Sequence, residues 1–326
     1  MEIHKIALLT SGGDAPGMNA AIRAVVRSAI YHHLEVVGVL RGYQGLIDAN
    51  FVSLQLESVS NIIGRGGTIL KTARCAEFFE KEGREKAVEQ LKKNRIDGLI
   101  VIGGNGSFRG AHLLAIEHNF PVIGVPGTID NDIMGTDFSI GSDTAVNTAL
   151  EAIDKIRDTV SSMERIFVVE VMGRKEGYIA LRVGLGGGAE DVLIPQTEYD
   201  IERMCEDIKR GRKRGKVSWI IIVSEGVAGS KDVASLIEDI TGFETRSITL
   251  GHIQRGGSPT AMDRILASRL GAEAVNALLK GESDKMTGIS GEEVKLVDFI
   301  SACAQERKKK NRLDREIYGL VRILAT

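Results

Sequence analysis

Short apolar runs that each end in a glycine-rich loop recur along the chain. Residues 6–9, 97–102 and 120–125 are almost wholly apolar, as is typical of strands buried on both faces. Segments with helical periodicity accompany them, from Met18 to about Tyr31 and over residues 81–94. Because strands that alternate with helices form mostly parallel sheets with helices on both faces, the sequence predicts an α/β protein.

The second half of the chain repeats this pattern. Its expected strands cover residues 165–171, 191–194 and 219–224, and residues 248–258 are expected to form another strand and a Gly turn. Its expected helices run from 140–145 to about 160, over about 178–188 and over 200–214, with another from near Met262. A length of 326 residues is large for one core and suits two lobes of ~150 residues each. We therefore expect two similar α/β lobes.

Charge and cysteine content narrow the cellular setting. The net charge of −2 gives no argument for nucleic acid or an anionic membrane as a partner. Cys75, Cys205 and Cys303 lie far apart, with neither metal-ligand spacing nor an even number for disulfides, which suits a reducing cytosol. The first residues lack the apolar core of a signal peptide, and no apolar run approaches the ~18 residues of a membrane span. These features predict a cytoplasmic protein.

The segment 126–133, with the sequence PGTIDNDI, carries the strongest chemical signal. It follows the apolar run 120–125, and loops just past strand ends are where open α/β sheets place their active sites. Thr128, Asp130 and Asp132 project from it at a spacing of two, which suits proton abstraction beside a bound metal or phosphate. The alternative is a turn rich in capping residues, since Thr, Asp and Asn all cap helices.

Glycine-rich loops also follow two other expected strands, over residues 10–17 and 103–107, and a helix begins after each. Backbone N–H groups and a helix N-terminus then face the same side, which favours phosphate binding. The first loop lacks the Walker A pattern and the dinucleotide pattern G-x-G-x-x-G, so a nicotinamide dehydrogenase is a poor interpretation.

Five motifs together resemble the bacterial ATP-dependent 6-phosphofructokinase family. They are TSGGDAPGMN at 10–19, GGNGS at 103–107, PGTIDND at 126–132, VEVMGR at 169–174 and GHIQRGGSP at 251–259. The resemblance covers nearly the whole chain. It implies two Rossmann-like three-layer αβα lobes with mostly parallel sheets: an ATP-binding lobe of residues 1–141 and 254–304, and a fructose-6-phosphate-binding lobe of residues 142–253 and 305–326.

The same resemblance implies an activity and its partners. The γ-phosphoryl group of ATP would pass to the 1-hydroxyl of fructose 6-phosphate, with Mg²⁺, in a homotetramer, giving ADP and fructose 1,6-bisphosphate. Asp130 would be the general base, Thr128 and Asp132 would place substrate and metal, Gly13 would approach the transferring phosphoryl group and Arg174 would stabilise its charge.

Binding residues are implied in the same way. The sugar-phosphate pocket would contain Met172, Gly173, Glu225, His252 and Arg255, with Arg165 and Arg246 reaching it from a neighbouring subunit. The ATP side would contain Tyr43, Arg74, Cys75, Gly104, Asn105, Gly106 and Ser107. Taken singly, each arginine is an ordinary surface charge and His252 an ordinary half-buried histidine.

An allosteric site for nucleotide or phosphoenolpyruvate is implied between subunits. Its expected residues are Arg23, Arg27, Arg157, Glu190, Arg214 and Lys216. Leu56 stands where the family has arginine, with Glu57 beside it, which should weaken an anion site. The sequence therefore leaves the response to those effectors open.

Asn105 is the most consequential departure from the family pattern, which has aspartate there. Asparagine keeps the shape and one acceptor oxygen but loses the charge, so Asn105 is expected to be a weakened metal ligand beside Asp132. Phe79 and Lys71 are smaller departures on the ATP side.

Two alternative functions remain within the superfamily. Asn105 favours a catalytically weak regulatory or sugar-phosphate-binding paralogue, against which intact Asp130, Thr128 and Arg174 speak. A pyrophosphate-dependent enzyme ranks lower, since such members have Asp and Lys where this chain has Gly106 and Gly127, glycines expected to leave room for the α-phosphate and nucleoside.

Overall fold

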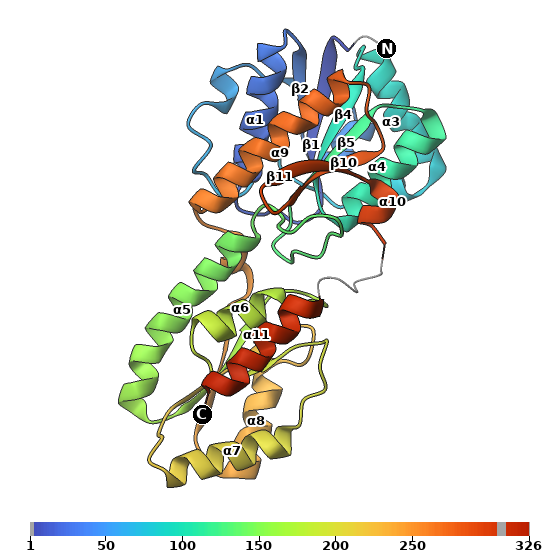
Figure 1. Cartoon of the computed structure of the whole chain (residues 1–326). Coiled ribbons are helices and arrows are strands. Elements are labelled where there is room, and N and C mark those ends of the chain that lie inside the picture. The colour runs from blue at the N-terminus through green and yellow to red at the C-terminus, as the bar shows by residue number, and fades with distance from the viewer. Residues whose placement is uncertain (1–2, 305–310, 326) are drawn as a thin grey trace. The chain divides into compact units, whose positions relative to one another are not determined.

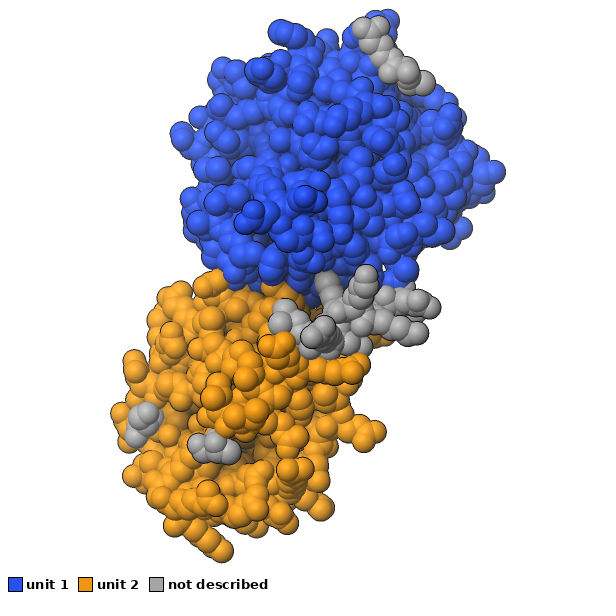
Figure 2. Space-filling model, viewed as in Figure 1, with its two compact units in different colours: residues 1–144, 255–305 blue, residues 145–254, 306–326 orange. Residues whose placement is uncertain are grey.

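The chain divides into two compact units, each of which contains its own sheet. A computed structural model describes residues 3–304 and 311–325. Unit 1 comprises residues 1–144 and 255–305, and unit 2 comprises residues 145–254 and 306–326 (Figure 2). These limits lie within a few residues of the expected lobes. The crossing expected near 304 adjoins residues 305–310, which lie outside the described part of the chain.

Unit 1 contains a seven-stranded sheet in the order β11-β10-β5-β4-β1-β2-β3 (Figure 1). Its strands are β1 (Lys5–Thr10), β2 (Glu35–Val39), β3 (Phe51–Ser53), β4 (Gly98–Gly103), β5 (Val122–Pro126), β10 (Lys285–Ser290) and β11 (Glu293–Asp298). The central strands are parallel, and the edge strands β3 and β11 are antiparallel to their neighbours. This arrangement confirms the predicted mostly parallel sheet.

Helices cover both faces of this sheet, as predicted. On one face α1 (Met18–Tyr31) packs against α9 (Ala261–Leu279). The other helices are α2 (Gly42–Ile47), α3 (Lys81–Lys93), α4 (Asn105–His118) and α10 (Phe299–Ala302), with the short 3₁₀ turns η1 (Glu57–Val59) and η2 (Glu77–Phe79).

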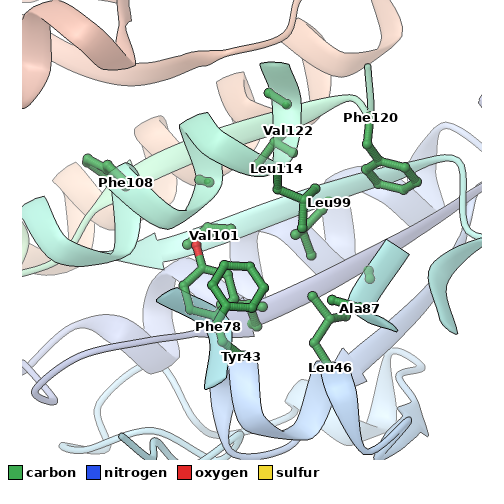
Figure 3. Close-up of a cluster of buried hydrophobic side chains, with 14 of the residues drawn as sticks. Tyr43, Leu46, Phe78, Ala87, Leu99, Val101, Phe108, Leu114, Phe120 and Val122 are labelled. Carbon is green, nitrogen blue, oxygen red and sulfur yellow. The ribbon is translucent and has the colours of Figure 1, made fainter. Parts of the chain in front are cut away.

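The apolar core between the sheet and helices α2, α3 and α4 is shown in Figure 3. Leu99 and Val101 of β4 point into it and meet Phe108 and Leu114 of α4. Every residue of β4 is buried, which explains why its sequence is apolar without alternation. Burying each large side chain here contributes roughly 1.5–3 kcal/mol, which fixes the strand ends that carry the loops described below.

Unit 2 contains a four-stranded parallel sheet in the order β7-β8-β6-β9. Its strands are β6 (Ile166–Val171), β7 (Asp191–Leu193), β8 (Trp219–Ser224) and β9 (Thr245–Thr249), and its helices are α5 (Ser142–Met163), α6 (Tyr178–Gly186), α7 (Ile201–Lys213), α8 (Ser230–Thr241) and α11 (Asn311–Leu324). The helix α5 begins in unit 1, and the 3₁₀ turn η3 (Gly251–Arg255) ends there. None of the helices among residues 3–304 and 311–325 is long and apolar enough to cross a membrane.

Most predicted elements are confirmed, and one strand begins earlier than predicted. Of the strand and Gly turn expected over residues 248–258, the strand β9 starts at Thr245 and ends at Thr249, and Gly251–Arg255 form the turn η3. Gly251 has a positive φ of 53°, a conformation that ends extended structure there. The hairpin of β10 and β11 was not anticipated.

Candidate functional site

Three loops of unit 1 meet at one edge of its sheet. They follow the neighbouring strands β1, β4 and β5, whose ends are level, because Thr10 pairs with Ile102 and Gly103 with Pro126. Backbone hydrogen bonds continue beyond the strands, from Ser11 N to Ile102 O (3.0 Å) and from Gly127 N to Gly103 O (2.9 Å). The parallel register therefore brings together residues that lie more than 100 positions apart.

The first loop, residues 10–17, lies against Arg255. The Nη1 atom of the Arg255 guanidinium donates to the carbonyl oxygen of Asp14 (3.0 Å). A Cβ at Gly13 would lie 2.2 Å from the same nitrogen, so only glycine accommodates Arg255 there. The expected sugar-phosphate residue Arg255 thus belongs to unit 1 and lies beside the expected phosphoryl-contacting residue Gly13.

The second loop, residues 103–107, opens α4. Gly104 is the N-cap residue, and Asn105, Gly106 and Ser107 form the first turn, so their N–H groups lie at the positive end of the helix dipole. A Cβ at Gly103 would lie 2.5 Å from Ser107 Oγ, whereas a Cβ at Gly106 would meet nothing within 4 Å. Gly106 therefore faces open space.

The third loop, residues 127–141, carries the expected base. Asp130 is buried, with 2% of its surface exposed. The Thr128 hydroxyl oxygen accepts a hydrogen bond from Asp130 N (3.3 Å). Gly127 was expected to leave room for the α-phosphate and nucleoside. A Cβ at this position would instead lie 3.2 Å from both Ile102 and Met18, so Gly127 faces packed side chains.

Asn131 and Ser139 brace this loop from within. Asn131 has a φ of 48°, and its amide donates to Asp137 O (3.0 Å) and accepts from Ser139 N (2.9 Å). The Ser139 hydroxyl donates to Thr128 O (2.7 Å). Sequence reasoning assigned no role to either residue, although Asn is a preferred residue for left-handed backbone.

Asp132 is held by Asn105. The amide nitrogen Nδ2 of Asn105 donates to Asp132 Oδ2 (2.8 Å) and lies 3.4 Å from the Asp132 carbonyl oxygen. Among the described residues, no three His, Cys, Asp or Glu side chains gather to hold a metal ion. Mg²⁺ commonly binds through one or two carboxylates together with substrate phosphates, and the remaining oxygen of the half-exposed Asp132 carboxylate suits an ion that arrives in this way.

Tyr43 lies beneath the second loop rather than on its surface. Its hydroxyl donates to Ser107 O (2.6 Å), and its ring stacks on Phe78 with centroids 3.8 Å apart (Figure 3). Burial raises the pKa of the Tyr43 hydroxyl. Of the other expected ATP-side residues, Arg74 is exposed, and Cys75 is half-buried with a pKa raised by burial.

Arg84 holds the backbone at Phe78 and Phe79. Its guanidinium forms two hydrogen bonds with Glu117 (2.6 and 2.7 Å) and donates to the carbonyl oxygens of Phe78 (3.0 Å) and Phe79 (2.7 Å). The side chain of Phe79 itself is exposed. This arrangement was not predicted, because Arg84 occurs within a charged amphipathic segment whose charges are ordinarily solvated.

Asp263 joins the third loop to α5 and was also missed. Its buried carboxylate accepts from Gly141 N and Thr144 N (both 2.8 Å) and from the Thr144 hydroxyl (2.5 Å). Burial raises the pKa of this carboxyl. The pattern Thr260-x-x-Asp263 is a recognisable helix start, and Thr260 Oγ1 accepts from Asp263 N (3.3 Å).

Unit 2 presents a second group of expected residues at the carboxyl edge of its sheet. After β6, Met172 is buried, and Gly173 and Arg174 both have positive φ. Glu225, which follows the neighbouring strand β8, accepts from Gly173 N (3.1 Å) and Arg174 N (2.7 Å). His252 follows β9 at the same edge and is exposed. The structure therefore brings Met172, Gly173, Arg174, Glu225 and His252 to one edge.

Arg165 and Arg246 lie at the opposite edge of that sheet. Arg165 precedes β6, and Arg246 pairs with Phe167 near the start of the parallel strand β9. Both bind Glu244: Arg165 Nε at 2.7 Å, and Arg246 through Nη2. Because five residue steps of β6 span about 17 Å, these arginines are remote from Met172 within their own unit.

The expected allosteric residues are divided between the units. Arg23 and Arg27 lie on α1 of unit 1, and Arg157 on α5 of unit 2, where it donates to Gly188 O (2.7 Å). Lys216 pairs with Glu190 (3.3 Å). Lys216 and Glu190 line a cavity of about 720 Å³ in unit 2, together with Arg214, Asp191, Trp219 and Tyr318. Burial raises the pKa of the Asp191 carboxyl in this cavity.

The chain has two α/β units with mostly parallel sheets, and unit 1 has glycine-rich loops and a buried aspartate at one edge of its sheet. These features define an α/β enzyme suited to phosphate-bearing ligands. Residues 5–278 match the family model described as Phosphofructokinase. The chain is 56% identical over 323 residues to proteins named ATP-dependent 6-phosphofructokinase from Bacillus cytotoxicus and Bacillus thuringiensis, covering 99% of this chain and 100% of each relative. The chain belongs to the phosphofructokinase family.

Solved structures agree with this assignment. Phosphofructokinase from Saccharomyces cerevisiae superposes with a TM-score of 0.86 at 34% identity, covering 99% of this chain but only 48% of that chain. A Pichia pastoris phosphofructokinase crystallised in the T-state gives a TM-score of 0.88, also at 34% identity, and this chain spans 38% of its length.

Proposed function

We propose that this chain transfers the γ-phosphoryl group of ATP to the 1-hydroxyl of fructose 6-phosphate, giving ADP and fructose 1,6-bisphosphate in glycolysis. The buried Asp130, on the loop of residues 127–141 at the sheet edge where the three loops of unit 1 follow their strands, carries this proposal. Full-length relatives at 56% identity are named for the same reaction. Asp130 acts as general base and takes the proton of the attacking hydroxyl, a contribution of about 10²–10⁴ in rate.

Unit 1 binds ATP in this proposal. The N–H groups of residues 104–107 and of Gly13 face the phosphates, and the open space at Gly106 admits the nucleotide. Arg255, which lies against Gly13, adds a positive charge to the same loop. The Asp132 carboxylate would hold Mg²⁺ together with the phosphates, and the ion would supply positive charge against the charge that develops during transfer. Tyr43 supports the loop from beneath, and Arg74 and Cys75 complete the ATP side.

Unit 2 binds fructose 6-phosphate. Glu225 fixes the backbone of Gly173 and Arg174, which orients the turn that carries the Arg174 guanidinium. His252 and Met172 lie at the same sheet edge and contact the sugar phosphate. The Arg174 side chain stabilises the transferring phosphoryl group, because a planar guanidinium binds two phosphate oxygens at once.

Arg165 and Arg246 bind the 6-phosphate of a neighbouring subunit in a homotetramer. Their shared bond to Glu244 already holds the two guanidinium groups together, which prepares them for one phosphate. Their position at the opposite sheet edge supports a role in another subunit rather than in their own.

The effector site comprises Arg23, Arg27, Arg157, Glu190, Arg214 and Lys216. The ion pair of Lys216 with Glu190 and the exposed Leu56 and Glu57 reduce the positive charge available to an anionic effector. We place the enzyme in the cytoplasm, since its three cysteines are free.

Product identification tests the function directly. The purified chain is incubated with fructose 6-phosphate, MgCl₂ and either ATP or pyrophosphate, and phosphorus NMR follows the products. The proposal predicts fructose 1,6-bisphosphate and ADP with ATP, and no sugar bisphosphate with pyrophosphate. Product from pyrophosphate alone would reassign the phosphoryl donor, and binding of fructose 6-phosphate without turnover would indicate a regulatory paralogue.

A further inference from the structure

The hydrogen bond between Asn105 and Asp132 joins two of the three loops of unit 1 by side chains. Asn105 begins α4, whereas Asp132 lies on the loop of residues 127–141 that also carries Asp130. The bond runs from the amide nitrogen to the carboxylate, with a length of 2.8 Å. Without a cation between them, a carboxylate at this position would repel Asp132, whereas the amide donor of Asn105 binds it.

This orientation turns the donor end of the Asn105 amide towards Asp132. The amide oxygen, the one atom of this side chain that binds a cation, points away from the Asp132 oxygen that accepts the bond. A metal ion shared by Asn105 and Asp132 therefore requires the amide to turn over and the bond to break.

The end of the helix α10 contacts both loops that this bond joins. The thiol of Cys303 donates to the backbone oxygen of Asn105 (3.6 Å). Met134 N, two residues beyond Asp132, donates to Ala302 O (3.2 Å). The loops of residues 103–107 and 127–141 and the helix α10 are thus joined by hydrogen bonds between protein atoms, without a metal ion in between.

We propose that Asn105 is a positioning residue that holds Asp132, and with it the loop of Asp130, in place without a metal ion. A divalent cation shared by two carboxylates would make the same connection, and here the neutral amide replaces it. The site is therefore assembled before the nucleotide binds, and the metal arrives with the nucleotide phosphates. Only this last step depends on the proposed function.

Mn²⁺ binding without nucleotide tests the proposal. The electron paramagnetic resonance signal of free Mn²⁺ falls when the ion binds, so uptake can be titrated without turnover. The unmodified chain and Asn105→Ala are expected to bind none at this site, and Asn105→Asp is expected to bind one Mn²⁺ per chain. Uptake by the unmodified chain that Asn105→Ala abolishes would show that Asn105 is a metal ligand and overturn the proposal, as would no uptake by Asn105→Asp.

Amide hydrogen exchange measures the positioning itself. Asn105→Ala is expected to speed the exchange of residues 127–141 by about 10- to 100-fold, because a hydrogen bond to a charged group is lost. In Asn105→Asp, the same loop should exchange fast without metal and regain protection with Mn²⁺. Unchanged exchange in Asn105→Ala would contradict the proposal, and circular dichroism confirms that each variant is folded.

Asn276 provides the matched control. It lies on α9, where its amide nitrogen donates to Glu273 Oε2 (3.2 Å), so it forms the same kind of bond outside the candidate site. Asn276→Asp and Asn276→Ala should bind no Mn²⁺ and leave residues 127–141 unchanged. A kinase that proves inactive would refute the proposed function, whereas these readouts would still decide the role of Asn105.

Discussion

The Tyr43 hydroxyl donates a 2.6 Å hydrogen bond to the carbonyl oxygen of Ser107 in the first turn of α4. Tyr43→Phe keeps the ring stacked on Phe78 and removes this bond. We expect a loss of about 1 kcal/mol in the free energy of unfolding, the usual net value of one hydrogen bond, and a several-fold higher KM for ATP. Urea unfolding and initial rates at varied ATP measure the two effects.

Tyr31→Phe is the control for that substitution, because the Tyr31 side chain is 79% exposed. It should change neither the free energy of unfolding nor the KM for ATP. A KM for ATP that is identical in all three proteins would show that Tyr43 does not support the nucleotide loop.

Gly13→Ala should impair catalysis more than stability. Its Cβ would lie 2.2 Å from Arg255 Nη1, so the guanidinium must move away from the loop of residues 10–17. The far end of an arginine moves at little cost in stability. We expect kcat/KM to fall by at least about tenfold, the effect of one displaced charge-assisted contact, with a nearly unchanged melting temperature.

Gly64→Ala is its matched control, because Gly64 also faces an arginine. Its added Cβ would lie 3.6 Å from the guanidinium of Arg264, an ordinary van der Waals distance. Activity close to that of the unmodified chain is expected here. Equal losses in both variants would show that the contact with Arg255 is not the cause.

The pair of Arg84 and Glu117 should make stability depend on pH. The Arg84 guanidinium lowers the pKa of the Glu117 carboxyl, so the folded state holds the carboxylate more strongly than the unfolded state does. This contribution is complete above the unfolded pKa of about 4.3 and is lost as the pH falls through the lowered folded value. We expect Glu117→Gln to cost about 2 kcal/mol at pH 7 and progressively less below pH ~4.3.

Urea unfolding at a series of pH values measures that dependence. Glu85→Gln on α3, the helix of Arg84, removes an exposed pair with Lys81 and should cost less than about 0.5 kcal/mol at every pH. A Glu117→Gln penalty that grows as the pH falls would contradict the assigned direction.

Mixing of variant subunits tests the proposed homotetramer and the proposed action of Arg246 across subunits. Arg246→Ala and Asp130→Asn should each be nearly inactive alone. If Arg246 serves a neighbour, a hybrid contains sites with an intact Asp130 from one chain and an intact Arg246 from another. Random mixing should then restore about a quarter of the sites. No recovery after proven subunit exchange would place Arg246 in the site of its own chain.

The strand-and-loop pattern was sufficient to predict the fold and the loops of unit 1, because runs such as β4 and β8 are buried along their whole length. Contacts between side chains that lie far apart in the sequence could not be predicted in this way. The bond from Asn105 to Asp132 depends on the level ends of β4 and β5, and the contact of Arg255 with Gly13 spans more than 240 residues.

Residues that support the candidate site without belonging to it are hard to recognise from a single sequence. Arg84 resembles any charge on an amphipathic helix until Glu117 and the carbonyl oxygen of Phe78 are placed beside it. The hairpin of β10 and β11 was not predicted, although the sequence carries two signals for it. β11 alternates half-buried and exposed residues over most of its length, and the two-residue turn Gly291-Glu292 has glycine at its first central position, as type II′ hairpin turns do.

The rate of Asp130→Asn tests the central claim most directly. ADP formation that depends on fructose 6-phosphate is measured with saturating MgATP for the unmodified chain, Asp130→Asn and Asp137→Asn. Asp137 lies on the same loop but is exposed, and its carboxylate accepts a hydrogen bond from Gly291 N (2.7 Å). We predict that kcat falls about 10²- to 10⁴-fold in Asp130→Asn and stays near normal in Asp137→Asn. Equal rates in the unmodified chain and Asp130→Asn would contradict the assignment of Asp130 as the general base.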